Sequence, residues 1–425
     1  MKNKAMFLFA ACALAGAAQA LSVTDVSAHA RYPWQSVIDV DFTVSDSKAS
    51  DLFKVGLSAT CDGGKKKLYA RTFLNEPLCG YGTSRVSWDV GADYPDLNVD
   101  DIQVAVTVAP INPASVNALD VYMVIDLSSG PNSPRYPVHY TLTPPVLVPT
   151  NDLVACAADP NRTTKLWLKR VKTNEFPLDG CDTDLNGDML MKISPCYVSI
   201  FEVTQKQWNL VMDTWPSGFS NVTYRAARPV EKIMLKDIIG HANWPDSKEV
   251  SEQSFVGRVR SRSGLASFNV TTEAQQESAC RAGRNGSLYG VTMRHKIPSS
   301  EYNGYNYNEG PDKGTAIVGS FGANKWGFYD CCGNVAELCL DSYLVLADLL
   351  AHYRRKYPGQ DITVTPVEDP IGPPNNQDGK SRNHVLRGGA WDETTCATYS
   401  RSEFKYDNKG STRVGIRVAV SPEWK

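Results

Sequence analysis

The strongest constraint on the fold is a two-residue hydrophobic alternation in the first third of the chain. Ile38, Val40, Phe42 and Val44 alternate with mostly polar side chains, and the same period returns at 102–108 and 121–127. Such alternation is typical of strands with one buried face. Clusters of Gly, Pro, Asn and Asp separate the runs, so residues 21–145 are predicted to form an all-β sandwich of immunoglobulin-like character.

The first 20 residues have the pattern of a signal peptide. Lys2 and Lys4 precede an apolar run, and Ala18-Gln19-Ala20 has the small-x-small form that signal peptidases cleave. We therefore expect cleavage near Ala20 and a mature chain that is secreted or periplasmic. A lipoprotein anchor at Cys12 is the less favoured alternative, because the apolar stretch before it is too short for export.

Charge and hydropathy limit the kinds of partner. The chain has 44 basic and 46 acidic residues, a net charge of −2, with no block of either sign. We therefore expect no nucleic-acid partner. Beyond the leader, no apolar run approaches the ~20 residues that a bilayer crossing requires, so we expect no membrane insertion of the mature chain.

A second domain is predicted to follow a proline-rich boundary. Closely spaced prolines after Thr143 interrupt both helices and strand ladders, which predicts a linker at 146–166 and a second domain at 167–425. Within this domain, Thr204 with Gln207 and Thr272 with Gln275 have the spacing of capping boxes. They predict two helices, and a third helical period runs from 343 to 357.

Cysteine is frequent enough to suggest disulfides in an exported protein. Cys61 and Cys79 would close a loop of about 19 residues, but the connectivity cannot be deduced from the sequence. A zinc site at Cys331, Cys332 and Cys339 is disfavoured, because zinc thiolates are usually spaced by two to four residues. The cysteines that remain after cleavage are Cys61, Cys79, Cys156, Cys181, Cys196, Cys280, Cys331, Cys332, Cys339 and Cys396.

Several motifs in a fixed order resemble the formylglycine-generating enzyme family, also called the sulfatase-modifying-factor domain, over about 167–420. The resemblance implies an α+β, C-type-lectin-like fold with little regular secondary structure, and an exported protein in which a β-rich domain comes first. The fold class is therefore expected to be mixed. The motifs are Phe201-Glu202-Val203-Thr204, Pro229-Val230, Thr272-Glu273-Ala274, Ala279-Cys280-Arg281-Ala282-Gly283, Gly327-Phe328-Tyr329-Asp330, Gly333-Asn334-Val335-Ala336-Glu337, Val385 to Trp391 and Gly415-Ile416-Arg417.

The resemblance also implies a calcium site around Gly333-Asn334, in residues 330–337, which we call the Gly-Asn segment or Gly-Asn loop. Its ligands would be the side chains of Asp330 and Glu337 and the backbone carbonyls of Gly333 and Val335, all of them hard oxygens. The alternative is structural: Asp330 caps a turn and Glu337 pairs with an arginine.

Two other acidic or amide-rich loops are weaker calcium candidates. The family's second calcium site would fall on Asn306, Asn308 and Asp312. The run 182–188 has the start of an EF-hand loop, but its twelfth position is Ile193 rather than glutamate, so a polar hairpin turn is favoured there.

The family's chemistry depends on a part that this chain lacks. Its enzymes oxidise a sulfatase cysteine to formylglycine with a copper ion held by two cysteines after an Arg-Gly-Gly motif. Here the segment Ala390–Arg401 contains only Cys396, which would be the catalytic candidate, and Ala336 replaces the family's usual tryptophan. Two thiolates suit Cu(I), so a single cysteine should bind it poorly and we expect no copper. The cofactor that we expect is the calcium implied by the resemblance. The six histidines show no spacing of an iron triad.

Two functional hypotheses follow. One is an exported, calcium-stabilised binding or structural module with a protein or glycan partner. The other is a formylglycine-generating oxidase that acts on a sulfatase cysteine.

Overall fold

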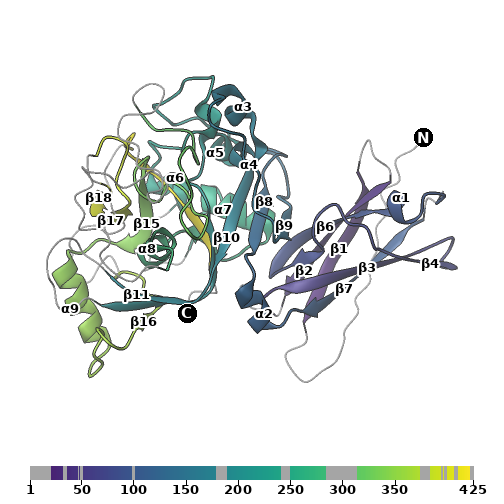
Figure 1. Ribbon diagram of the computed structural model, residues 1–425, viewed down its shortest axis with the longest axis horizontal. Helices are drawn as coiled ribbons and strands as arrows, with labels where there is room; N and C mark the ends of the chain where they lie inside the picture. Colours follow the sequence, from purple (N-terminus) through teal and green to yellow (C-terminus); the bar gives the residue numbers. More distant parts are fainter. Residues whose placement is uncertain are drawn as a thin grey trace.

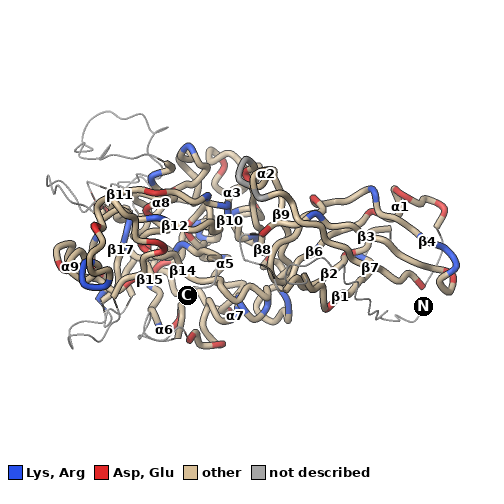
Figure 2. The backbone as a smooth tube through the Cα atoms, turned by 90° about the horizontal axis from the view of Figure 1, so that it is seen from below, with Lys and Arg blue, Asp and Glu red and all other residues tan. Residues whose placement is uncertain are grey.

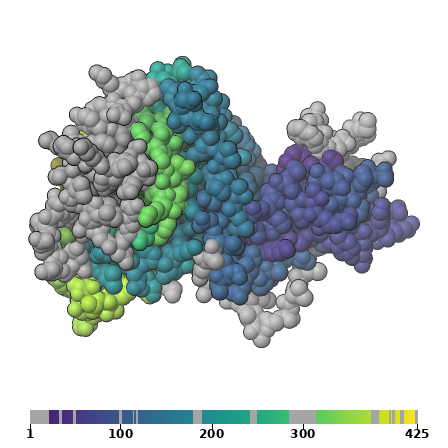
Figure 3. Space-filling view, viewed as in Figure 1, coloured from purple at the N-terminus to yellow at the C-terminus, as the bar shows by residue number. Residues whose placement is uncertain are grey.

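The computed structural model describes residues 21–31, 36–45, 47, 51–97, 101–178, 189–240, 249–283, 314–373, 383–393, 396, 400–405 and 410–421. The fold is mixed: a sheet-rich N-terminal domain lies end to end with a larger domain that contains sheets and short helices (Figure 1, Figure 3). No described helix has the length and apolar character needed to cross a membrane. Lys and Arg are interspersed with Asp and Glu along both domains (Figure 2).

The N-terminal domain is the predicted sandwich of antiparallel sheets. One sheet has the order β1-β2-β6, and in the other β3 pairs with β4 and β5 on one side and with β7 on the other. The side chains of Val40, Phe42 and Val44 are fully buried in the core, together with Trp88. The elements are β1 (Ser22–Ala30), β2 (Val37–Ser45), β3 (Phe53–Cys61), β4 (Lys66–Tyr69), β5 (Leu78–Cys79), β6 (Gly82–Asp89), α1 (Val90–Asp93), β7 (Gln103–Pro110) and α2 (Pro113–Ala118).

The strand predicted at 121–127 is present, but it does not belong to the sandwich. It forms β8 (Tyr122–Asp126), which pairs with β9 (Val138–Thr141) and with β10 (Lys165–Val171). Alternation identifies a strand and its buried face but not its partner, so the sequence alone placed this segment in the wrong sheet. The predicted linker 146–166 contains two short helices, α3 (Leu153–Ala158) and α4 (Pro160–Thr163).

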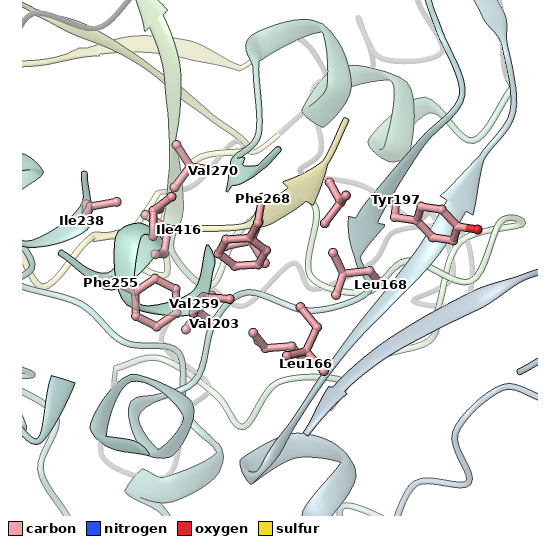
Figure 4. Packing of buried hydrophobic residues seen from close by; sticks show 14 of the residues in the cluster. Leu166, Leu168, Tyr197, Val203, Ile238, Phe255, Val259, Phe268, Val270 and Ile416 are labelled. Atoms are coloured by element: carbon pink, nitrogen blue, oxygen red, sulfur yellow. The ribbon is translucent and has the colours of Figure 1, made fainter. Parts of the chain in front are cut away.

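A six-stranded sheet of order β14-β20-β13-β10-β8-β9 is the centre of the larger domain. Its two faces belong to different hydrophobic clusters: Leu166 and Leu168 pack on one side, and Trp167 between them packs on the other. Phe255 and Val259 of α7 (Phe255–Ser263) and Phe268 of β14 fill the first cluster (Figure 4). The further sheet strands are β13 (Cys196–Ser199), β14 (Phe268–Val270) and β20 (Val418–Val420).

Two smaller sheets complete the larger domain. Their orders are β11-β12-β16 and β18-β17-β15-β19, and the second of them carries the Gly-Asn segment at one end of β15. Their strands are β11 (Asn174–Pro177), β12 (Leu190–Ile193), β15 (Ala336–Ser342), β16 (Val367–Glu368), β17 (His384–Arg387), β18 (Arg401–Phe404) and β19 (Val414–Gly415).

Both predicted capping boxes are confirmed. Thr204 caps α5 and Thr272 caps α8, and in each case the side chain of the glutamine three residues later accepts a hydrogen bond from the backbone amide of the capping threonine. The third predicted helix is α9, which begins three residues later than the periodicity indicated. The remaining helices of this domain are α5 (Gln205–Met212), η1 (Arg225–Ala227), α6 (Leu235–Ile238), α7 (Phe255–Ser263), α8 (Glu273–Arg281) and α9 (Leu346–Lys356).

We predict that Trp208→Ala destabilises the larger domain by about 3–5 kcal/mol, because the indole is 2% exposed and stacks on Phe255 with ring centroids 5.1 Å apart. Urea unfolding followed by circular dichroism measures the loss. Val222→Ala is the control: this side chain is 78% exposed, and its truncation should change the free energy of unfolding by no more than about 0.5 kcal/mol. Equal effects of the two substitutions would contradict the packing described here.

Candidate functional site

The Gly-Asn segment is a tightly turned, buried loop. Asp330, Gly333 and Asn334 all have positive φ angles, of 53°, 87° and 58°. Left-handed backbone is disfavoured for residues with a Cβ, so Asp330 and Asn334 hold this geometry through their surroundings. Both side chains are 1% exposed.

Asn334 ties the loop to three other segments. Its Oδ1 accepts a hydrogen bond from the Ala316 amide (2.9 Å), and its Nδ2 donates to Glu202 Oε2 (3.0 Å). Its backbone carbonyl accepts from the Trp391 amide (2.9 Å). The Asn of the Gly-Asn motif is therefore an organising residue, and its position brings Glu202 into the site.

Arg417 is the buried cation of the site. Its Nε and Nη2 donate to Glu337 Oε1 at 2.9 and 2.6 Å. Nη1 also donates to the Ser199 carbonyl and Nη2 to the Tyr329 carbonyl, both at 2.8 Å. Arg417 and Glu337 are each 0% exposed, so this ion pair is screened very little by water.

Three buried carboxyl groups gather near this one guanidinium. Burial raises the pKa of Asp330 to about 6, although the Gly319 amide donates to Asp330 Oδ2 at 2.6 Å. Burial also raises the pKa of Glu337 against the opposing charge of Arg417. For Glu202, burial and the charge of Asp330 place the pKa well above its usual range. The cluster therefore contains more buried carboxyl groups than buried guanidinium groups.

Two carboxylate oxygens of this cluster have no hydrogen-bond partner of normal geometry among the described residues. Asp330 Oδ1 is buried and has no hydrogen-bond partner among the described residues. Glu337 Oε2 also has no hydrogen bond of normal geometry, although the side-chain amide of Gln276 lies near the Glu337 carboxylate. Buried polar atoms are rarely left in this state, because desolvation then goes uncompensated. Calcium bound by these oxygens would satisfy both atoms.

The predicted calcium ligands thus stand as follows. Asp330 and Glu337 lie in one buried cluster, joined by the loop that contains Gly333 and Val335. The contacts of the structural alternative are also present, since Glu337 pairs with Arg417 and Asp330 accepts from a loop amide. Within the described ranges, no group of three or more His, Cys, Asp or Glu side chains is placed so that it could hold one metal ion. Asn306, Asn308 and Asp312 lie outside the described residues.

Cys396 is a buried thiol. It is 1% exposed, and its Sγ points to the Ala390 carbonyl at 3.7 Å. Burial raises its pKa to about 12, with a further contribution from the Glu393 charge, so the thiol is protonated at neutral pH. Gly389 has a φ of 76°, and a Cβ there would lie 2.7 Å from Cys396 Sγ. The glycine of the Arg-Gly-Gly motif is required for this close packing.

Comparison with known proteins identifies the larger domain. The model of the family described as sulfatase-modifying factor enzyme 1-like domain matches residues 176–422, more than half of the chain. The chain belongs to this family. The motifs that carried the resemblance, among them the Gly-Asn loop and the Arg-Gly-Gly motif, lie inside the matched region.

Two individual relatives are distant in sequence. The chain is 26% identical over 219 residues to chaperone protein LppX of Paenibacillus barcinonensis, covering 44% of this chain and 75% of that protein. It is 24% identical over 215 residues to the formylglycine-generating enzyme of Thermomonospora curvata, covering 48% of this chain and 59% of that enzyme. The chain thus spans less than two thirds of that enzyme's length.

Two solved structures resemble the chain loosely. Treponema denticola variable protein 1 matches with a TM-score of 0.44 and 22% sequence identity, and the aligned part covers 61% of this chain and 96% of that protein's chain. PvdO from Pseudomonas aeruginosa matches with a TM-score of 0.43 and 17% sequence identity, and the aligned part covers 60% of this chain and 94% of that protein's chain.

A second buried charge cluster surrounds α8 of this sulfatase-modifying-factor domain. Arg387 Nη2 lies 2.7 Å from Glu277 Oε2, and Arg281 Nη2 lies 2.7 Å from Glu277 Oε1. Arg401 pairs with Glu273 at 2.6 Å. The sequence motifs did not predict that Glu202, Glu273 and Glu277 form these buried clusters. The i, i+4 spacing of Glu277 and Arg281 was the one local signal, since the other partners are distant in sequence.

We predict that Arg417→Met costs about 3–5 kcal/mol, because it leaves Glu337 buried without its counter-charge. Chemical denaturation gives the loss in free energy of unfolding. The matched control is Arg413→Met: Arg413 pairs with Asp392 at 2.8 Å, but its side chain is 45% exposed. An exposed pair contributes about 1 kcal/mol or less. Comparable losses for the two variants would rule out a special role for the buried pair.

Asp341 predicts a pH dependence of stability. Burial and the Glu273 charge raise its pKa to about 7, against an unfolded value near 3.9. The folded state therefore binds the proton more tightly, and the contribution of this group to stability falls as pH rises from about 4 to about 7. Asp341→Asn should flatten this fall, which could reach about 4 kcal/mol. Urea midpoints between pH 4.5 and 7.5 measure the slope, and Glu252→Gln, at an exposed position, should leave it unchanged. A slope equal in wild type and Asp341→Asn would refute the assignment.

Proposed function

We propose that this chain is an exported binding or structural module built on the sulfatase-modifying-factor fold, without the copper chemistry of the family's oxidases. The single observation that carries the proposal is Cys396, the lone thiol of the segment Ala390–Arg401, which is buried and protonated. Two thiolates suit a soft Cu(I) ion, so a single thiol should bind it poorly. Within the described cysteines, Cys396 Sγ has a backbone carbonyl as its contact and no sulfur.

Calcium is the cofactor that we propose for this module. Asp330, Gly333, Val335 and Glu337 would hold it. The support is the pair of carboxylate oxygens in the site that lack partners and the excess of buried acid over base. The ion would neutralise charge and fix the loop, which is an architectural rather than a chemical contribution. Asn306, Asn308 and Asp312 remain our candidates for a second calcium ion.

The partner of the module is proposed to be a protein or glycan in the exported compartment. A cleft of about 940 Å³ between β3, β4 and β9 offers one surface for it, and Lys54, Lys165 and the exposed Tyr69 line this cleft. A relative named a chaperone is in keeping with a protein partner. Export itself rests on the predicted leader at 1–20.

The second candidate is a formylglycine-generating oxidase, favoured by the similarity to the Thermomonospora curvata enzyme. Copper titration separates the two. Our proposal expects no high-affinity Cu(I) binding by the purified mature chain in competition with a Cu(I) chelator, and no difference between wild type and Cys396→Ser. Tight binding that Cys396→Ser abolishes would favour the oxidase.

The oxidase also has a direct activity test. A peptide with a sulfatase-type Cys-x-Pro-x-Arg motif is incubated with the protein, copper and oxygen, and its mass is followed. We expect no conversion of the thiol to an aldehyde. Conversion by wild type but not by Cys396→Ser would overturn our proposal.

Calcium binding predicts a metal-dependent melting temperature. At a free calcium concentration of 100 times Kd, binding to the native state alone would add about 2.7 kcal/mol of stability. Treatment with a chelator should lower the melting temperature, and added calcium should restore it. Asp330→Asn should abolish the difference, whereas Glu368→Gln, with a 71% exposed side chain, should retain it. Identical melting curves with and without chelator would reject the site.

A further inference from the structure

Two buried thiols from distant parts of the chain lie against each other. Cys280 is near the end of α8 and Cys332 is in the Gly-Asn loop, and their Sγ atoms are 3.4 Å apart. The residues are 8% and 4% exposed. A disulfide has an S–S bond of about 2.05 Å, so the two sulfurs would need to approach each other by little more than about 1 Å.

We propose that Cys280 and Cys332 form a disulfide that joins α8 to the Gly-Asn loop. Of the neighbouring thiols, Cys339 Sγ points toward the Glu337 carbonyl at 3.7 Å. Cys331 also lies against Cys280: its carbonyl is 3.6 Å from Cys280 Sγ and the two thiols interact, although Cys331 Sγ points toward the Tyr329 carbonyl at 3.6 Å. The sulfur–sulfur contact of 3.4 Å is made with Cys332, which we therefore assign as the partner of Cys280. The inference is independent of the proposed function.

The backbone on both sides of the pair is already fixed. Asn324 Nδ2 donates to the Ala279 carbonyl at 2.8 Å, next to Cys280. The Gly333 amide, next to Cys332, donates to the Gly388 carbonyl at 2.9 Å. The two thiols are thus held in register by contacts that do not involve sulfur. This preorganisation raises the effective concentration of one thiol at the other and favours the disulfide.

The bond would form by exchange with a disulfide oxidant such as glutathione disulfide. One cysteine thiolate attacks the oxidant and releases one glutathione thiol, leaving a mixed disulfide on the protein. The second cysteine then attacks the protein sulfur of that mixed disulfide and releases the other glutathione. Two protein thiols are oxidised and one glutathione disulfide is reduced to two thiols, so electrons and protons balance.

The cross-link would close a ring of about 50 residues of the chain. Closing a ring of this size restricts the unfolded ensemble, and the oxidised protein should melt roughly 10 °C above the reduced one. It would also anchor the loop that carries Asp330 and Asn334 directly to α8. In the thiol form, α8 and the loop are joined by non-covalent contacts, among them the hydrogen bond that Gln276 Nε2 donates to the Cys331 carbonyl at 3.3 Å.

The test uses the full mature chain, unfolded and refolded in glutathione redox buffer so that buried thiols can exchange. Free thiols are then alkylated in denaturant without reductant, and proteolytic fragments are analysed by mass spectrometry. We expect a linked fragment that joins Cys280 to the 331–332 segment, still in the majority at a tenfold excess of reduced over oxidised glutathione. Because Cys331 and Cys332 are adjacent, the variant Cys331→Ala assigns the bond: it should keep the linked fragment, and Cys332→Ala should lose it.

Three results would overturn the proposal. They are alkylation of both Cys280 and Cys332 in refolded wild type, a link from Cys280 to a different cysteine, and retention of the linked fragment in Cys332→Ala. A melting comparison supplies an independent readout: reductant should lower the melting temperature of wild type and Cys331→Ala, but not that of Cys280→Ala. An equal effect of reductant on Cys280→Ala would also reject the bond.

Discussion

The larger domain depends on one buried ion pair. Arg417 reaches Glu337 at the start of β15, the end of β13 through the Ser199 carbonyl, and the segment before the Gly-Asn loop through the Tyr329 carbonyl. It lies directly before β20, a strand of the central sheet. One guanidinium therefore fixes two sheets and a loop relative to one another. Such a fold can tolerate long irregular segments, because a few polar contacts with strict geometry replace extended ladders.

The same pair explains why this region carries an electrostatic imbalance. Glu202, Asp330 and Glu337 all lie near Arg417, and each has a raised pKa because burial disfavours its charged form. A protein can relieve such an excess by keeping protons on the acids or by binding a cation. The two solutions respond differently to conditions, since one depends on pH and the other on the available metal. The site is thus sensitive to its surroundings although it is closed to solvent.

Local signals in the sequence predicted local structure well. The alternation at 38–44 gave a buried strand face, and Thr204 and Thr272 gave the starts of two helices, because each of these patterns is completed within a few residues. The motif order gave the family. Partners distant in sequence were not predictable in the same way: nothing local to 121–127 indicates pairing with β10. Likewise, no local pattern connects Glu202 with Asn334, since that contact exists only after the chain has folded.

The central sheet has a consequence for how this domain can be separated from its neighbour. The family match begins at residue 176, yet β8, β9 and β10 all precede it in sequence and form half of the six-stranded sheet. A fragment cut at the start of the match would leave β13 as a bare edge, with a row of unpaired amides and carbonyls beside exposed apolar side chains. Edges of that kind recruit other chains. The segment that can fold on its own must therefore include β8, β9 and β10, and it is longer than the region that the family model matches.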